Sequence, residues 1–230
     1  MTETLILAAI LIPCLIVAIV FHEVAHGWTA LALGDPTARD KKRLSLNPIR
    51  HVDPVGTLLV PGALALMGGP IFGWAKPVPV RQDRLDNPRF GMMAVAAAGP
   101  GTNLVLALVG AVLAGIVAGL SGAAGVEPGG WGMTALTYFI LINIFLALFN
   151  LLPIPPFDGS HIVGGLLPRR FVRHWQRLQA MGMLLLVVLI AATWAFPGSG
   201  VIEHVVLPPV VWMEAQYFAI ANWVANGIAG

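Results

Sequence analysis

The chain has 230 residues, of which 57% are hydrophobic and only 10% are charged, so an ordinary soluble domain is excluded and an integral membrane protein is predicted. All 13 lysines and arginines lie in residues 39–50, 76–89 and 169–177, although the formal net charge is only +2. Such short basic segments between apolar runs exclude a nucleic-acid-binding surface and are typical of the cytoplasmic loops of a membrane protein.

The first apolar run covers residues 5–33 and predicts a membrane helix that ends before Gly34-Asp35-Pro36. Five basic residues follow within residues 39–50. Because positive charge is enriched in cytoplasmic loops, we expect this end of the helix to face the cytoplasm and the N-terminus to lie on the other side.

This helix contains the motif His22-Glu23-Val24-Ala25-His26 near its C-terminal end. The spacing puts both imidazoles on one helix face about one turn apart, where they can bind one cation. Neutral imidazole suits zinc, and Glu23 could take a proton from metal-bound water as that water attacks a carbonyl. Structural histidines are the alternative, but ionisable groups inside a membrane helix usually have a function. We therefore predict a metal site.

Residues 55–73 form a shorter apolar segment that is broken by prolines and glycines. A full span here would carry the basic segment 76–89 to the outside, against the charge rule, so a re-entrant segment is favoured over a short span. Irregular backbone at membrane depth needs protein or a water-filled cavity around it. We therefore expect this segment to border the active site.

The next stretch, Trp74-Ala75-Lys76-Pro77-Val78-Pro79-Val80, alternates and contains prolines, so it can be only an edge strand or an extended segment. An extended edge could pair with a substrate strand. A loop that packs on the rim of the bundle is the alternative.

Residues 92–120 predict a central helix that is interrupted at Gly99-Pro100-Gly101, with Asn103 just beyond the interruption. Glycines at 110, 115 and 119 favour close contact with other helices. The connection at 121–132 has no lysine or arginine and is expected outside.

Residues 134–152 predict a helix that returns to the cytoplasmic side and ends in a proline-rich turn leading to Asp158-Gly159. Asp158 then reaches the depth of His22 and His26, and two histidines with one aspartate leave the fourth zinc position open for water. A turn or capping aspartate is the alternative. His161 is a rival ligand that ranks second, because a bend at Gly159 is expected to turn it away.

Two asparagines of this helix, Asn143 and Asn150, lie on one face. Asn150 could donate to the carbonyl oxygen of a bound peptide or to the oxyanion that forms, whereas an interhelical hydrogen bond is expected for Asn143.

After the basic loop at 169–177, residues 178–196 predict another span, and residues 201–226 either insert or lie at the interface. The expected fold is an all-α polytopic membrane protein, a bundle of about four to six membrane helices with a re-entrant segment and a short extended edge. We expect a single domain over 1–230, with a catalytic core at about 5–165 and C-terminal membrane segments at about 178–226.

Together the motifs resemble the site-2 protease family of intramembrane zinc metalloproteases. The resemblance depends on His22-Glu23-Val24-Ala25-His26, on Ala98-Gly99-Pro100-Gly101-Thr102-Asn103, and on the stretch from Asn150 to Asp158-Gly159. With Gly73-Trp74-Ala75-Lys76-Pro77-Val78-Pro79-Val80, the chain is similar to the small bacterial branch that lacks a PDZ domain, and the similarity covers most of residues 15–165.

The resemblance implies a zinc ion held by His22, His26 and Asp158, with Glu23 as the catalytic base. Asn150, and with it Asn103, becomes a candidate for contact with the scissile carbonyl or the oxyanion. The implied substrates are membrane-spanning helices, cleaved in the bacterial inner membrane among its lipids, with the active site toward the cytoplasm. No nucleic-acid partner is expected.

Two other functions could use the same His, His, Asp site. A metal transporter would be expected to show internal repeats and further polar residues along a route, and neither stands out in the sequence. A metal-binding scaffold without activity would not need Glu23.

Overall fold

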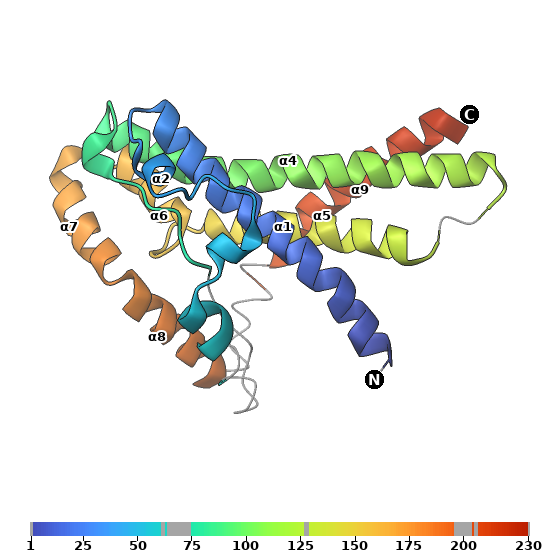
Figure 1. Cartoon of the computed structure of the whole chain (residues 1–230), viewed down its shortest axis with the longest axis horizontal. Helices are drawn as coiled ribbons and strands as arrows, with labels where there is room; N and C mark the ends of the chain where they lie inside the picture. Colours follow the sequence, from blue (N-terminus) through green and yellow to red (C-terminus); the bar gives the residue numbers. More distant parts are fainter. Residues whose placement is uncertain are drawn as a thin grey trace.

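The computed structural model describes residues 2–60, 63, 75–126, 129–195, 204 and 207–229, and these form helices and no β-strand (Figure 1). The α-helices are α1 (Thr2–Ala32), α2 (Thr37–Asp40), α4 (Pro88–Ala123), α5 (Trp131–Asn150), α6 (Asp158–Leu166), α7 (Arg169–Ala180), α8 (Gly182–Ala195) and α9 (Leu207–Ala229). The short helices η1 (Pro48–His51), η2 (Pro54–Leu59) and η3 (Gln82–Arg84) lie between α2 and α4. The predicted all-α fold is confirmed.

Helix α4 is the central element, and it packs against α1, α5, α6 and α9 (Figure 1). Its 36 residues correspond to a length of about 54 Å, well beyond the hydrocarbon core of a bilayer. The predicted interruption at Gly99-Pro100-Gly101 is wrong, because the helix continues through Pro100. In a membrane bundle, neighbouring helices and local adjustments compensate for the hydrogen bond that a proline removes.

The small residues of α4 allow α5 and α9 to approach its backbone, as the glycine pattern predicted. A Cβ built on Gly119 would lie only 2.8 Å from the carbonyl oxygen of Ala225, and one on Gly110 would lie 3.0 Å from the Ile140 side chain. For residues 201–226, the described part is the helix α9, which packs on α4, and its insertion into the membrane or position at the interface stays a prediction. Close backbone contact of this kind is how apolar helices associate in lipid.

Within the described residues, three helices are long and apolar enough to cross a membrane: Leu5–Ala32 of α1, all of α4 and all of α5. The protein is therefore a membrane protein. Because this number covers only the described residues, the expected total of four to six membrane helices stays a prediction, and the 14 described residues of α8 are fewer than the ~20 that a span needs. Most of the segment predicted to be re-entrant, residues 55–73, lies outside the described residues, so that part of the fold stays a prediction.

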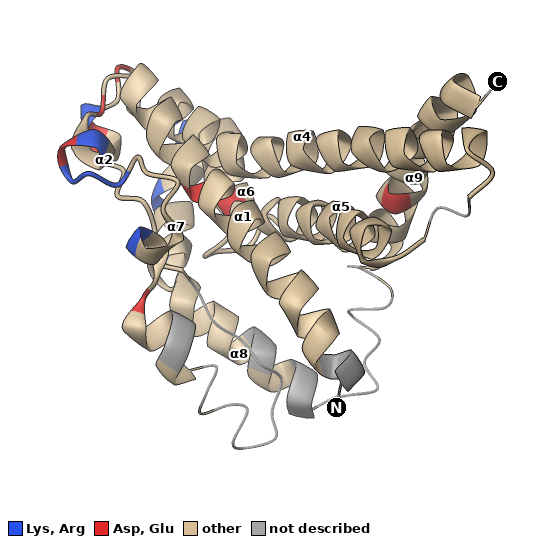
Figure 2. Ribbon diagram, turned by 45° about the vertical axis from the view of Figure 1, so that its right-hand side comes forward, with Lys and Arg blue, Asp and Glu red and all other residues tan. Residues whose placement is uncertain are grey.

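The basic residues gather at one end of the molecule, around α2 and the C-terminal end of α1, whereas the far ends of α4 and α5 carry none (Figure 2). The segment expected to be a basic loop at 169–177 is instead helical and belongs to α7. Arginine is a good helix former, and the helical spacing of Arg169, Arg173 and Arg177 places them on one face, away from Trp175, which packs on α6.

Candidate metal centre

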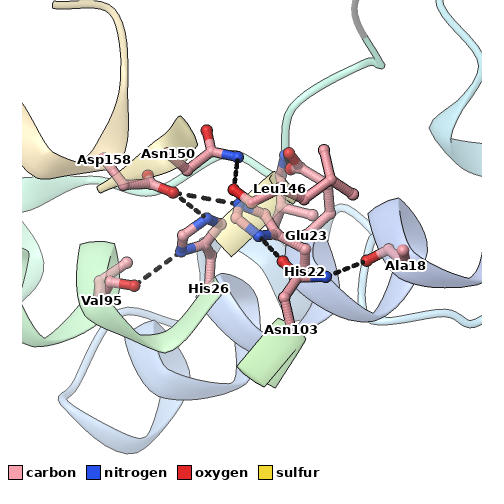
Figure 3. A network of polar contacts seen from close by, with 10 residues as sticks. Ala18, His22, Glu23, His26, Val95, Asn103, Leu146, Asn150 and Asp158 are labelled. Carbon is pink, nitrogen blue, oxygen red and sulfur yellow. Dashed lines mark hydrogen bonds and ion pairs between the residues drawn. The ribbon is translucent and has the colours of Figure 1, made fainter. Parts of the chain in front are cut away.

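Helix α1 supplies two imidazoles that lie one turn apart, as the sequence spacing predicted. The ring centroids of His22 and His26 are 4.6 Å apart, and the two residues are only 7% and 9% exposed. Both side chains point toward α4 and the start of α6 (Figure 3). Two nearly buried histidines in an apolar bundle require specific polar partners.

Gly99 of α4 lies directly against these two rings. A Cβ built at this position would be 2.5 Å from Cε1 and Nε2 of His26 and 2.6 Å from Cε1 of His22, far inside van der Waals contact. The glycine of the motif read as a helix interruption is therefore the point at which α4 can approach the imidazoles. Gly99 leaves room for the two imidazole rings, and this role was not predicted from the sequence.

The hydrogen-bond network determines which nitrogen of His22 carries the proton. The amide nitrogen of Asn103 donates to the Ala18 carbonyl at 3.2 Å and to Oδ1 of Asn143 at 2.8 Å, so its oxygen Oδ1 must face His22 as an acceptor. His22 Nδ1, at 2.6 Å from that oxygen, is then the donor. The lone pair of His22 Nε2 is left for another ligand.

The second imidazole has the same tautomer for an independent reason. His26 Nδ1 lies 2.7 Å from the carbonyl oxygen of Val95, which can only accept a hydrogen bond. Nδ1 therefore carries the proton and Nε2 has the lone pair. A backbone carbonyl has no signature in a sequence, so this contact could not be found there.

Asp158 arrives from the far side as the first residue of α6, after the turn that follows α5 (Figure 3). Its Oδ2 is 3.1 Å from His22 Nε2 and 3.3 Å from His26 Nε2. Gly159 does not form the expected bend but lies inside α6. Its lack of a Cβ lets the first turn of α6 pack against the carbonyl oxygens of Leu151 and Leu152, where any side chain would collide.

These three side chains form the group of potential metal ligands found in the described part of the chain, with their ligand atoms all within 4.8 Å of one another. With both histidines protonated on Nδ1, two nitrogen lone pairs and a carboxylate oxygen face each other, and buried Oδ2 has no hydrogen-bond donor. Such an arrangement is repulsive unless a cation or an added proton lies between the atoms.

The separations fit a metal ion. Ligand atoms about 2.1 Å from a tetrahedral zinc ion lie about 3.4 Å from one another, close to the 3.1 and 3.3 Å observed. Imidazole nitrogen with carboxylate oxygen is a donor set that zinc binds readily. The Asp158 side chain is 19% exposed, against 9% and 11% for the two histidine side chains, so the site is more open on the aspartate side.

Glu23 follows the first ligand but is not one of the three metal-facing groups. Its Oε2 accepts a hydrogen bond of 2.8 Å from the backbone N–H of Val78, a contact across 55 residues of sequence. In the part of the chain that is described, Oε1 has no hydrogen-bond partner. One carboxylate oxygen is thus held by the protein, and the other remains able to accept a proton.

The asparagines expected near the substrate have different surroundings. Asn150 lies beside Asp158, and its amide nitrogen donates one hydrogen bond of 2.9 Å to the Leu146 carbonyl, which leaves a second N–H (Figure 3). Asn103 is fully buried and its amide has partners at both ends, so it contacts His22 and has no group to offer a substrate. Asn143 makes the interhelical hydrogen bond expected for it, to Asn103.

His161, the rival ligand, lies outside the three-residue group. It is on α6, and its Nδ1 is 3.3 Å from the amide nitrogen of Gln179 on α7. It lines a cavity of about 140 Å³ together with Arg89, Trp175 and Gln179.

Comparison with known proteins identifies relatives. The model of peptidase family M50 matches residues 130–192. YwhC of Bacillus subtilis (strain 168) is 40% identical over 183 residues, which are 78% of this chain and 78% of that protein. Rip2 of Mycolicibacterium smegmatis is 25% identical over 208 residues, which cover 83% of this chain and 74% of Rip2. MJ0611 of Methanocaldococcus jannaschii is 42% identical over 74 residues, about 30% of each chain. All three are named as candidate zinc metalloproteases, and no solved structure matches the chain.

Proposed function

Because the chain belongs to peptidase family M50, the site-2 protease family, and is a zinc metalloprotease of the membrane, we propose that it cleaves peptide bonds in or beside the transmembrane helices of other membrane proteins. The observation that carries the proposal is the convergence of two imidazole lone pairs and one carboxylate oxygen inside an apolar bundle, next to a glutamate that is not a ligand. Soluble substrates would have little access to a site built between lipid-facing helices.

In this proposal His22, His26 and Asp158 hold the zinc ion, and Asn103 and the Val95 carbonyl keep the imidazoles in the required tautomer. Zinc, when bound, supplies a Lewis acid that polarises the scissile carbonyl and lowers the pKa of a water molecule. Asn103 and the Val95 carbonyl matter because an imidazole with the proton on Nε2 would have its lone pair on Nδ1, the nitrogen that faces away from the ion.

Glu23 is the general base, and Oε1 is the atom that takes the proton from the attacking water. As the new carbon–oxygen bond forms and the carbon–nitrogen bond breaks, the same carboxyl group returns the proton to the leaving amine nitrogen. The unused N–H of Asn150 donates to the scissile carbonyl oxygen, where negative charge develops.

The site is proposed to receive water from the cytoplasm across the inner membrane of a bacterium. His26 lies about 9 Å along α1 from its end at Ala32, and the basic residues 39–50 follow that end. Basic loops are enriched on the cytoplasmic side of membrane proteins, which supports the proposal that the site lies near that face. A transporter is less well supported, because no second group of potential metal ligands lies along the described helices.

The test is the Glu23→Gln variant of the full chain, expressed with a membrane-protein substrate. The amide keeps the shape of the side chain but cannot take a proton, so cleavage should fall at least about 1,000-fold while the zinc content stays near that of the wild type. Cleavage by Glu23→Gln at the wild-type rate would overturn the proposal. Chelator-sensitive zinc uptake by both proteins, without cleavage by either, would favour a transporter.

A further inference from the structure

Residues 75–81 form a segment without regular secondary structure that contacts α1 next to the proposed site, and we call it the strap. Three of its five N–H groups donate to the elements around it. Lys76 N–H donates to the His51 carbonyl at 2.8 Å, Val78 N–H to Glu23 Oε2 at 2.8 Å, and Arg81 N–H to Asp35 Oδ2 at 2.6 Å. Pairing of these N–H groups with a substrate strand would first require that the bonds break.

The strap is anchored on both sides of Val78. On one side, the Arg43 guanidinium donates to the carbonyl oxygen of Lys76 at 2.7 Å and lies 3.4 Å from that of Pro77. On the other side, the Asp35 carboxylate is fully buried and also accepts hydrogen bonds from Thr37. Buried hydrogen bonds to charged groups are among the stronger ones, so the strap has a fixed position relative to α1.

Val78 is also held by its side chain. It is only 7% exposed, and a Cβ built on Gly27 would lie 2.9 Å from Val78 Cγ1. Gly27 is one helical turn beyond Glu23, so the valine side chain and its N–H contact the same face of α1 at successive turns. The position of this N–H is thus determined by packing as well as by the anchors.

The residues around Val78 make its N–H a single, directed donor. Pro77 and Pro79 have no N–H and restrict the backbone to extended conformations. A main-chain donor held in this way loses little conformational freedom when it binds a carboxylate, unlike a long side chain. The Pro-Val-Pro sequence, which had no role in the chemistry so far, presents one donor to one oxygen of Glu23.

We propose that the Val78 N–H is a positioning group for the proteolytic reaction: it holds Oε2 of Glu23 and so directs Oε1 toward the attacking water. This inference depends on the proposed role of Glu23 as the base. Since the carboxylate must lie within hydrogen-bond reach of the water, loss of the restraint lets the side chain leave the productive rotamer. A displacement of about 1 Å near a reacting centre can lower the rate about 100-fold.

Two variants separate the N–H from the side chain. Val78→Pro removes the donor and keeps an extended backbone, whereas Val78→Ala keeps the donor and removes two methyl groups. In the full chain in detergent, with a membrane-protein substrate, we expect Val78→Pro to lower kcat about 10- to 100-fold with unchanged KM and zinc content. Val78→Ala loses the side-chain packing but keeps both the N–H and the anchors at Arg43 and Asp35, so its kcat should fall clearly less than that of Val78→Pro.

Equal kcat values for the two variants would overturn the inference, as would a change confined to KM. If Val78→Pro does not retain zinc, Val78 is replaced by the α-hydroxy acid of valine. This ester analogue removes the N–H without adding the proline ring, and the same fall in kcat is expected for it. Wild-type kcat in the ester protein would contradict the inference.

A double-mutant comparison with Glu23 separates a positioning role of the Val78 N–H from a merely structural one. In Glu23→Asp, the shorter carboxylate no longer reaches the Val78 N–H, so adding Val78→Pro should lower kcat by less than about threefold. The same factor in both backgrounds would show that Val78 acts independently of Glu23. If Glu23→Gln remains active, the proposed function itself fails; if Glu23→Gln is inactive but Val78→Pro is as active as Val78→Ala, only the positioning role fails.

Discussion

Replacing Gly99 by alanine provides the sharpest test of the metal centre. The added methyl carbon would lie 2.5 Å from His26 Nε2 and 2.6 Å from His22 Cε1, whereas carbon atoms in contact are normally about 3.5–4.0 Å apart. Roughly 1 Å of overlap with two imidazoles must be relieved by movement of α4 or of the rings. Ligand positions at a metal site tolerate only about 0.2 Å, so we expect zinc affinity to fall about 10- to 100-fold or more.

Gly101→Ala is the matched control. Gly101 lies in the same helix two residues further on, and a Cβ there meets no atom within 4 Å. Alanine is also the better helix former by about 1 kcal/mol, so Gly101→Ala should fold at least as well as the wild type and keep its zinc. Gly99→Ala gains the same helix propensity, so any difference between the two variants reports on contact with the imidazoles.

The assay is competition for zinc between the purified protein in detergent and a chelator, with helix content followed by circular dichroism. We expect Gly99→Ala to keep its helix content, to lose zinc at a chelator concentration at least about tenfold lower than Gly101→Ala does, and to lose cleavage in parallel. Equal zinc retention by the two variants would refute the close approach of α4 to the histidines and, with it, the role assigned to this glycine.

Two further predictions concern the partners of the site and of the strap. Asn103→Leu removes the acceptor of His22 Nδ1, so zinc affinity measured by chelator competition should fall about 10- to 100-fold. Asn143→Leu should lower it by less, because its hydrogen bonds go to Asn103 and to the Phe139 carbonyl rather than to a histidine; the reverse order would contradict the hydrogen-bond relay. Burial alone would raise the pKa of Asp35, but hydrogen bonds from Arg81 and Thr37 outweigh it and hold the pKa below its ordinary value. Because the folded-state pKa is the lower one, the stabilisation is complete above about pH 4 and is lost as the pH falls from there toward the folded-state pKa. Asp35→Asn should lower the free energy of unfolding at neutral pH by about 1–3 kcal/mol. Below about pH 4, the Tm of the variant should fall less steeply with decreasing pH than the Tm of the wild type, and equal slopes would contradict this account.

Much of the architecture could be predicted from local patterns. The apolar runs predicted the helices α1, α4 and α5, because in lipid the backbone of such a run must satisfy its own hydrogen bonds. The four-residue spacing of His22 and His26 predicted their common face, since helical geometry is the same in any context. The errors have different causes: packing outweighs a local signal where the helix continues through Pro100, whereas at 169–177 the helix propensity of arginine was overlooked in favour of the charge pattern.

The sequence by itself determined a helical membrane protein and a pair of imidazoles, because both follow from periodicities that repeat every few residues. Only the tertiary structure decided what surrounds that pair. Asp158 is brought to the imidazoles by the close packing of Gly159, Gly99 leaves room for the rings, and the Val95 carbonyl and the Val78 N–H act through main-chain atoms. Every residue has such main-chain groups, so nothing in the amino-acid sequence distinguishes the ones that meet a histidine or a glutamate. Their selection depends on how distant helices pack, which is a property of the folded chain.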